Sequence, residues 1–266
     1  MGRQTVSGTC HLCGEDGKLS FEHVPPESGF NDRPLLLARA REILGASKLD
    51  QPHGRTQQRG AGKHTLCERC NNKTGHWYGA AFADWAYQAM HLLAFTDGRP
   101  SLYYQYRVFP LRVIKQIICM FFSANGPEFR RGYPELVRFV LDRDRRWMEP
   151  GIQILAFLSC SPRGRQSGVA ARLRLSKGIG DEWSTSRCVL SEIAFPPMGY
   201  VLLLDSAPPD ERLVDISFFA DYRYNDWKEF SFRLPVLPIY TAYPGDYRSR
   251  DQVLRDAAEA RGGRPL

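Results

Sequence analysis

Four cysteines of this chain form two Cys-x-x-Cys pairs, Cys10 with Cys13 and Cys67 with Cys70. Four thiolates on two such turns are the ligand set of a closed, tetrahedral zinc site. Four protein ligands leave no coordination position for a substrate, so we predict a structural zinc ion, and catalysis would need other residues. The alternative is a set of redox-active or simply buried cysteines, which the polar, turn-rich surroundings of both pairs disfavour.

Glu22 and His23 lie between the two cysteine pairs, and Asn71 directly follows the second pair. A carboxylate and an amide oxygen are hard ligands that suit Mg²⁺ or Mn²⁺. A neighbouring imidazole takes a proton from water near neutral pH. If zinc draws the pairs together, we expect these three side chains to converge on a site for metal-dependent phosphodiester hydrolysis. Asn72 competes with Asn71 as the amide ligand, and the sequence leaves that choice open.

The stretches CHLC, EHVPP and LCERCNNKTG together resemble the HNH endonucleases of the ββα-metal (His-Me finger) class, in the branch braced by two Cys-x-x-Cys pairs. The resemblance covers roughly residues 8–78. It implies that His23 is the general base and that Asn71 is the last ligand of the catalytic ion. Glu22 takes the place of the family's usual aspartate and is one methylene longer. Lys73 stands where the family often carries a basic residue that faces phosphate.

One family residue is missing from its expected position. The family's middle asparagine, which orients the catalytic histidine, is expected about five residues before the third cysteine, where this chain has Gly62. His64 is the candidate substitute, as an orienting or phosphate-contacting group. Lys63, Arg69 and Lys73 are the predicted nucleic-acid contacts.

The charge balance favours an acidic partner. The chain has 36 Lys and Arg residues against 29 Asp and Glu, a net charge of +7. This surplus favours nucleic acid, and the resemblance implies DNA. No apolar run approaches the ~20 residues that span a bilayer, and the first ten residues contain no apolar signal core, so we expect no membrane association and a cytoplasmic location.

Apolar periodicity and Gly or Pro breaks predict the elements along the chain. Residues 46–64 are few in apolar side chains and basic, and we predict a mobile loop there. A disordered end is expected after residue 260. The expected helices are 34–45, 71–95, 111–124, 134–147 and 249–260, and the expected strands are 102–109, 152–159, 169–175, 187–195, 199–205, 214–220 and 229–234.

These elements predict an α+β fold with two parts. Residues 1–95 would form a zinc-braced ββα-metal nuclease domain, with Zn²⁺ as the structural ion and Mg²⁺ or Mn²⁺ as the catalytic ion. Residues 96–266 would form a helical segment that leads into a β-rich, mainly antiparallel domain, which is the candidate surface for a protein partner or an oligomer. The resemblance also suggests a phage-defence or mobile-element context.

Two other functions remain open at this point. A non-catalytic zinc-knuckle module that binds nucleic acid would need the same cysteines and basic residues, with Glu22 and His23 as ordinary surface groups. A protein-interaction module would use the β-rich half as its binding surface. Replacement of His23 separates the first of these from a nuclease, because only a nuclease would lose a reaction.

Overall fold

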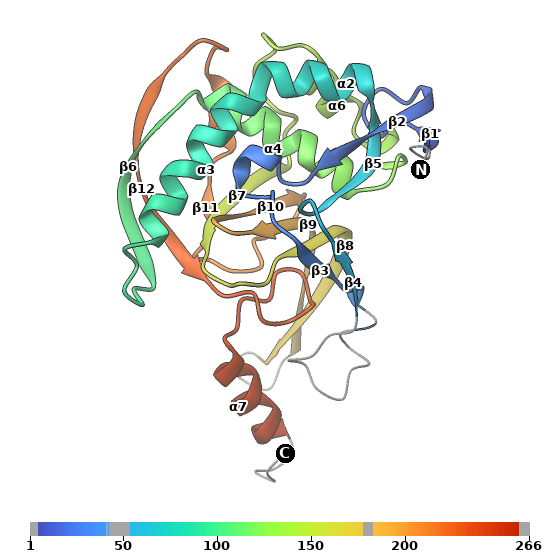
Figure 1. Cartoon of the computed structure of the whole chain (residues 1–266). Coiled ribbons are helices and arrows are strands. Elements are labelled where there is room, and N and C mark those ends of the chain that lie inside the picture. The colour runs from blue at the N-terminus through green and yellow to red at the C-terminus, as the bar shows by residue number, and fades with distance from the viewer. Residues whose placement is uncertain (1–4, 41, 43–53, 178–182, 261–266) are drawn as a thin grey trace.

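The amino-terminal part of the protein is a small antiparallel sheet followed by a helix (Figure 1). The structure is a computed structural model that describes residues 5–40, 42, 54–177 and 183–260. The sheet has the order β1-β2-β5, and helix α2 follows β5 without a break. The bounds are β1 (Ser7–Thr9), β2 (Asp16–His23), β5 (Gly62–Cys67) and α2 (Glu68–Thr74).

The helix predicted at 71–95 is confirmed, with one irregular turn in it. Helix α2 continues as a turn of π-helix, η2 (Gly75–Gly79), and then as α3 (Ala80–Leu93). The aromatic side chains of α3 serve as core, because Phe82 and Trp85 are buried. A π-turn widens the helix locally, and such turns are frequent at functional sites.

Helix α4 (Pro110–Ala124) is enclosed by the rest of the protein. Every residue from 110 to 123 except Arg112 is buried. A helix that is apolar on most of its faces is buried on most of them, as the sequence of this one predicts. It contacts β5, η2 and α3 of the amino-terminal part and also β8, β9 and η3 of the later part. Helix α4 therefore supports both halves of the chain.

The helix predicted at 134–147 is shorter than expected. It ends at Leu141, as α6 (Pro134–Leu141), after the short helix α5 (Phe129–Gly132). The buried ammonium of Lys115 in α4 donates hydrogen bonds to the carbonyl oxygens of Asp142 (2.6 Å) and Arg143 (3.0 Å). These carbonyls would have to bind backbone N–H groups if the helix continued, so the lysine favours its end here.

A seven-stranded sheet forms the larger part of the described fold, in the order β6-β12-β7-β10-β9-β8 with β11 beside β7. Its pairings are antiparallel, as predicted, except that β12 runs parallel to β7 at Val236 and Leu237. The bounds are β6 (Ser101–Val108), β7 (Ile152–Ser159), β8 (Arg165–Lys177), β9 (Trp183–Phe195), β10 (Met198–Leu204), β11 (Val214–Asp215) and β12 (Lys228–Leu237).

The two faces of this sheet pack against different segments. Alternate residues of β7 and β10, such as Ile154 and Leu202, join one large hydrophobic core that also contains α3, α4 and Cys10. The residues between them, such as Leu155 and Leu203, form a second cluster with the segment that ends at Tyr247. The protein is thus mixed α+β with a large sheet, while the division of the chain at residue 95 stays a prediction.

Two expectations for the amino-terminal half are wrong. Leu35–Leu37, predicted as helix, is strand β3, and it pairs with β4 (Arg55–Gln57), which lies in the predicted mobile loop. Strand β5 takes up the end of that loop as well. Backbone pairing between two segments overrides local helical spacing here. The rest of the predicted helix and loop, residues 41 and 43–53, lies outside the described residues.

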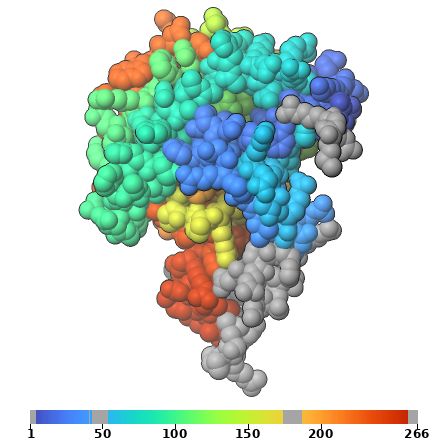
Figure 2. Space-filling model, viewed as in Figure 1, coloured from blue at the N-terminus to red at the C-terminus, as the bar shows by residue number. Residues whose placement is uncertain are grey.

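The strand predicted at 214–220 is also too long. It is only β11, and η3 (Ser217–Asp221) follows. The carboxylate of Asp215 accepts the backbone N–H of Ser217 at 2.7 Å, a local turn that ends the strand. The carboxy-terminal helix is confirmed as α7 (Arg250–Ala260), which protrudes from the body of the molecule (Figure 2). The predicted disordered end, 261–266, lies outside the described residues, and no helix within them is long and apolar enough to cross a membrane.

Candidate functional site

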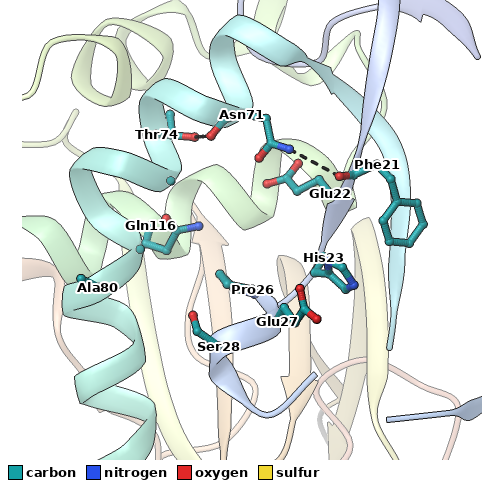
Figure 3. Close-up of a pocket in the computed structure, with 12 residues that line it drawn as sticks. Phe21, Glu22, His23, Pro26, Glu27, Ser28, Asn71, Thr74, Ala80 and Gln116 are labelled. Atoms are coloured by element: carbon teal, nitrogen blue, oxygen red, sulfur yellow. Dashed lines mark hydrogen bonds between the residues drawn. The ribbon is translucent and has the colours of Figure 1, made fainter. Parts of the chain in front are cut away.

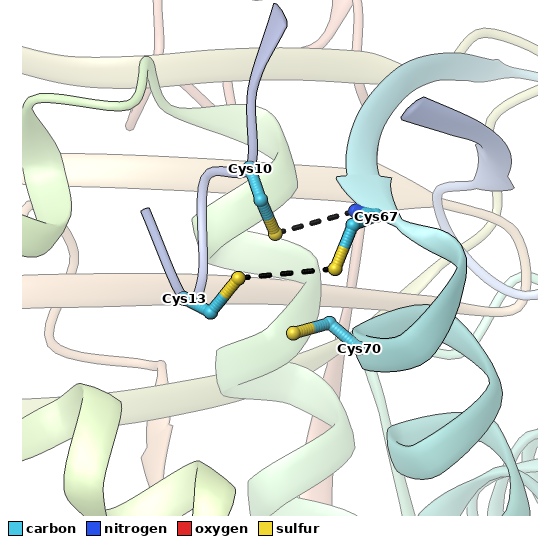
Figure 4. A group of neighbouring side chains, drawn as sticks. All are labelled: Cys10, Cys13, Cys67 and Cys70. Carbon is cyan, nitrogen blue, oxygen red and sulfur yellow. Dashed lines mark hydrogen bonds between the residues drawn. The ribbon is translucent and has the colours of Figure 1, made fainter. Parts of the chain in front are cut away.

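The four cysteines of the two Cys-x-x-Cys pairs lie together, as predicted (Figure 4). Their sulfur atoms are all within 4.8 Å of one another, and Sγ of Cys13 is 3.8 Å from Sγ of Cys67. Four sulfurs at about 2.3 Å from a tetrahedral zinc ion would be about 3.8 Å apart. The cluster therefore fits a structural zinc ion in both ligand type and spacing.

The first cysteine turn is shaped to hold its ligands. Gly14 has φ of +82°, and a Cβ there would overlap the guanidinium of Arg130. That guanidinium reaches from α5 and donates to the carbonyl oxygen of Cys13 at 2.9 Å. A hydrogen bond with Cys70, together with backbone N–H groups that include that of Cys67, lowers the pKa of Cys10 to about 4, and the same hydrogen bond raises the pKa of Cys70. The thiolate is the form that binds zinc, so Cys10 is set up as a ligand and zinc binding would release the proton that Cys70 keeps.

Glu22 is a buried carboxyl near the end of β2, only 6 % exposed. It lies beside a bulge in the partner strand: Ser20 pairs with Leu66 and Phe21 pairs with His64, so Thr65 is an extra residue of β5. The hydroxyl of this extra residue reaches the Glu22 carboxyl.

The surroundings of the Glu22 carboxyl make it responsive to a cation. Its Oε2 accepts hydrogen bonds from the hydroxyls of Thr65 (3.1 Å) and Ser123. Burial raises the pKa of Glu22 to about 7, and these hydrogen bonds offset only part of that rise. An opposite charge nearby favours the ionised form, so a bound cation would lower this pKa again.

A backbone hydrogen bond holds the neutral His23 ring in one tautomer. Its Nε2 lies 2.9 Å from the carbonyl oxygen of Arg59. A carbonyl only accepts, so Nε2 donates its proton, and Nδ1 of the neutral ring carries the free lone pair. The ring of Phe21 packs edge-on against the imidazole, with 5.0 Å between ring centroids. His23 thus has one free basic nitrogen in a fixed ring, as a general base requires.

Asn71 lies on α2 and faces Glu22. Its Nδ2 donates to the hydroxyl of Ser20 (3.1 Å) and to the carbonyl oxygen of Phe21 (3.4 Å), which leaves Oδ1 free. Figure 3 shows the amide of Asn71 beside the Glu22 carboxylate. Asn72, the alternative ligand, is exposed and does not line the pocket that Asn71 lines. The geometry therefore favours Asn71.

Glu22, His23 and Asn71 line one pocket of about 360 Å³ (Figure 3). The pocket lies between the end of β2, η1 (Glu27–Gly29) and the helix formed by α2 and η2. One carboxylate and one amide oxygen fit Mg²⁺ or Mn²⁺, which retain several water or phosphate ligands. The three residues that the sequence singled out are thus neighbours in space.

Asn31 is a residue of this site that the sequence reasoning missed. It is fully buried, and its Nδ2 donates to the carbonyl oxygens of Pro25 (2.6 Å) and Ala61 (2.7 Å). Its Oδ1 accepts the backbone N–H of Ala61 at 2.5 Å. One amide thereby joins the chain that leaves β2 to the chain that enters β5, close to His23. The asparagine that follows EHVPP by a few residues was the available signal.

The close approach of the two strands explains why no asparagine stands at position 62. Gly62 pairs with His23, and a Cβ there would lie 2.4 Å from the carbonyl oxygen of Glu22 and 2.7 Å from the Phe21 ring. Any larger side chain would push the strands apart. Asn31 supplies from the loop a bridging amide that position 62 has no room for.

We expect Asn31→Ala to lower the stability of the protein. The change leaves the carbonyl oxygen of Pro25 and the backbone N–H of Ala61 without their partner, at about 1–3 kcal/mol each. The loop that carries the Arg59 carbonyl would then no longer hold the His23 ring. Thermal unfolding measures the loss. Asn72→Ala is the control, and an Asn31→Ala protein that matches this control in melting temperature would contradict the bridging role.

His64 and Lys63 lie on β5 beside the pocket. His64 pairs with Phe21 across the strands, is exposed, and packs edge-on against that ring with 5.4 Å between centroids. The Arg59 carbonyl, and not His64, orients the His23 ring. Of the two roles expected for His64, a phosphate contact therefore fits its exposed position better than orientation of His23. Lys63 pairs with Glu22, and its side chain is exposed.

Arg69 and Lys73 lie on α2. Arg69 is exposed next to the cysteine cluster. A hydrogen bond with the sulfur of Cys13 raises the pKa of the Arg69 guanidinium above its usual value. The ammonium of Lys73 donates to the carbonyl oxygen of Leu141 (3.2 Å) and lies 4.4 Å from the centroid of the Trp77 ring. Both side chains remain predicted phosphate contacts.

Comparisons with known proteins return no match to this chain. No protein-family model, no curated protein sequence and no solved structure matches it. The resemblance of residues 8–78 to HNH endonucleases therefore depends on the motifs themselves. The function has to be argued from the residues that the fold brings together in the pocket.

Proposed function

We propose that the protein is a metal-dependent endonuclease that hydrolyses phosphodiester bonds of nucleic acid, with DNA as the substrate. In this proposal β2, β5 and α2 are a zinc-braced ββα-metal finger. One observation carries it: a histidine with a single free basic nitrogen lines the same pocket as a carboxylate and an amide oxygen that face each other. A module that only binds nucleic acid has no need of this combination.

His23 would act as the general base. Its Nε2–H stays bonded to the Arg59 carbonyl, which leaves Nδ1 to remove a proton from a water molecule that attacks the phosphorus atom. The imidazolium that forms keeps both N–H groups as donors.

Glu22 and Asn71 would hold the catalytic divalent ion. Such an ion stabilises the charge that builds on the phosphate and on the leaving oxygen. Thr65 and Ser123 orient the carboxyl through its Oε2. Ser20 and the Phe21 carbonyl orient the amide of Asn71 through its nitrogen. Each ligand is therefore positioned by neighbours that leave one oxygen free for the ion.

Exposed basic side chains beside the pocket would bind the phosphate backbone. Lys63 and His64 lie on β5 at the rim, and Arg69 and Lys73 lie on α2. The net charge of +7 supports the same role for the protein as a whole.

Glu22→Gln is expected to stabilise the protein above pH 7 when no Mg²⁺ or Mn²⁺ is bound. The folded pKa is about 7, and an unfolded glutamate has a pKa of about 4.3. The folded state therefore keeps a proton that the unfolded state loses between these values, and the wild type loses up to about 4 kcal/mol of unfolding free energy as pH rises through this window. With the structural zinc bound and no Mg²⁺ or Mn²⁺ added, the melting temperature of the variant should match that of wild type near pH 4 and exceed it at pH 8.

The same pair of proteins tests the proposed function. At pH 8, Mg²⁺ or Mn²⁺ should raise the melting temperature of wild type but not that of Glu22→Gln. Plasmid DNA should be cleaved by wild type with either ion, and neither by the variant nor in EDTA. Glu68→Gln, which removes an exposed carboxylate of α2 outside the pocket, is the matched control. Failure of wild type to cleave DNA or RNA with any divalent ion would favour the non-catalytic zinc-knuckle module.

A further inference from the structure

Gln116 lines the pocket from a part of the chain outside the proposed finger. It belongs to α4, is 4 % exposed, and reaches the pocket together with Glu22 and Asn71. Its Oε1 is buried and has no hydrogen-bond partner among the described residues. A buried amide oxygen without a partner is costly, so a glutamine that carries one and also lines a pocket points to a ligand that reorients its amide. Figure 3 shows the Gln116 amide directed into the space in front of Glu22.

The wall of the pocket next to Gln116 is made of residues with little or no side chain. Gly75, Gly79 and Ala80 line it, and they belong to the π-turn and the start of α3. A Cβ built on Gly75 or Gly79 would have no neighbour within 4 Å, so open space lies beside the backbone there. Small residues therefore leave room beside the Gln116 amide, and Ser28 and Thr74 complete the lining.

Hydrolysis of a phosphodiester needs nothing from this end of the pocket. The base and the ion ligands are His23, Glu22 and Asn71, and they lie at the other end (Figure 3). The whole pocket, including the part in front of His23, Glu22 and Asn71, has a volume of about 360 Å³, at the lower end of the range of sites that enclose a small organic group, about 300–1,000 Å³. The open space beside the backbone of Gly75 and Gly79 accepts a flat ring, and a side-chain amide offers a donor and an acceptor to the edge of that ring.

We propose that this end of the pocket takes an unpaired nucleotide next to the scissile phosphate, with Gln116 hydrogen-bonded to the edge of its base. A base in a duplex is stacked and paired, so it enters such a pocket only from a single strand or by leaving the stack. The substrate is therefore single-stranded or locally unpaired nucleic acid, and Gln116 is a specificity-determining residue. This inference rests on the proposed nuclease function.

The first test compares labelled oligonucleotides that differ only in pairing. Full-length wild type with Mn²⁺ is incubated with a duplex, with the same duplex that carries one unpaired nucleotide, and with the single strand. We expect cleavage of the unpaired and single-stranded substrates at least 10-fold faster than of the duplex, next to the unpaired nucleotide. Equal rates on all three would overturn the inference and leave the nuclease function standing. No cleavage of any substrate would overturn the proposed function, and this inference with it.

The second test fills the pocket without disturbing the helix. Gly79 has ordinary helical angles, φ −59° and ψ −44°, and free space around its Cβ position, so Gly79→Leu should fold. We expect this variant to keep the rise in melting temperature with divalent ion and to cleave the unpaired substrate at least 10-fold more slowly. The control Gly132→Leu adds the same bulk at an exposed position away from the pocket. A Gly79→Leu protein that cleaves like this control would contradict the pocket's role.

The third test addresses base recognition. The substrate library is randomised around the unpaired position. Wild type should prefer one or two of the four bases there by roughly 10- to 100-fold, the discrimination that a good amide–base contact supplies. Gln116→Met keeps the length of the side chain and removes its hydrogen-bonding groups. We expect this variant to lose the preference at that position and at no other. A preference that is unchanged in Gln116→Met would show that Gln116 does not contact the base.

Discussion

Replacement of His23 by alanine should reduce plasmid cleavage by a factor of about 10²–10⁴, the usual contribution of a general base. The protein should still bind DNA and bind zinc, because within the described residues the imidazole's hydrogen bond is to the Arg59 carbonyl and its ring contact is to Phe21, neither of which belongs to the cysteine cluster. Conversion of supercoiled plasmid to nicked and linear forms in Mg²⁺ or Mn²⁺ measures the rate. Fluorescence anisotropy with labelled DNA measures binding in the same preparations.

His91→Ala is the matched control for this experiment. His91 lies on α3, away from the pocket, and packs against Phe95. Its replacement should change neither rate nor binding. Equal cleavage by wild type and His23→Ala would place the reaction in some other residue or in a contaminating enzyme, and the proposed mechanism would be wrong.

Replacement of Cys67 by serine should abolish zinc binding and unfold the amino-terminal part of the protein. Structural zinc sites contribute on the order of 10–16 kcal/mol in apparent binding free energy, as much as the whole stability of a typical domain, about 5–15 kcal/mol. The four sulfurs join the turn between β1 and β2 to the end of β5 and to α2. Strand β2 and helix α2 carry the pocket, so the proposed nuclease activity should disappear as well. Zinc content by atomic emission, circular dichroism and thermal unfolding measure these losses.

Cys160→Ser is the control for the cysteine experiment, because Cys160 is exposed and lies outside the cluster. It should keep one zinc ion per chain and the wild-type melting temperature. A Cys67→Ser protein that contains no zinc but unfolds at the wild-type temperature would refute a structural role for the metal.

Helix α4 gives the later part of the chain a direct role at the proposed site. Ser123 binds the Glu22 carboxyl, Gln116 lines the pocket, and the carbonyl oxygen of Phe122 lies 3.1 Å from Nδ1 of His11 in the first cysteine turn. The resemblance to nucleases covered only residues 8–78, so none of these contacts follows from it. If the proposed function holds, residues 1–95 alone would keep Thr65 but lack Ser123, one of the two hydroxyls that orient the metal-binding carboxyl.

Much of the fold was predictable because the relevant patterns are local. Helix α4 and the rod of α2, η2 and α3 follow from apolar residues at helical spacing. Most strands of the large sheet follow from short apolar runs between turn residues. The helix prediction for Leu35–Leu37 was wrong because the strand that pairs with it, β4, begins 20 residues later, counted from Leu35 to Arg55. A pattern within one segment carries no information about such a partner.

The sequence by itself determined the ligand types: two cysteine pairs, a carboxylate next to a histidine, and an asparagine after the last cysteine. Their chemistry and spacing are written in the side chains. Only the tertiary structure decided how His23 and Glu22 are held. Their partners are the Arg59 carbonyl, 36 positions away, and the Ser123 hydroxyl, 101 positions away. Every residue has a carbonyl and serines are common, so neither partner is recognisable until folding brings it to the site.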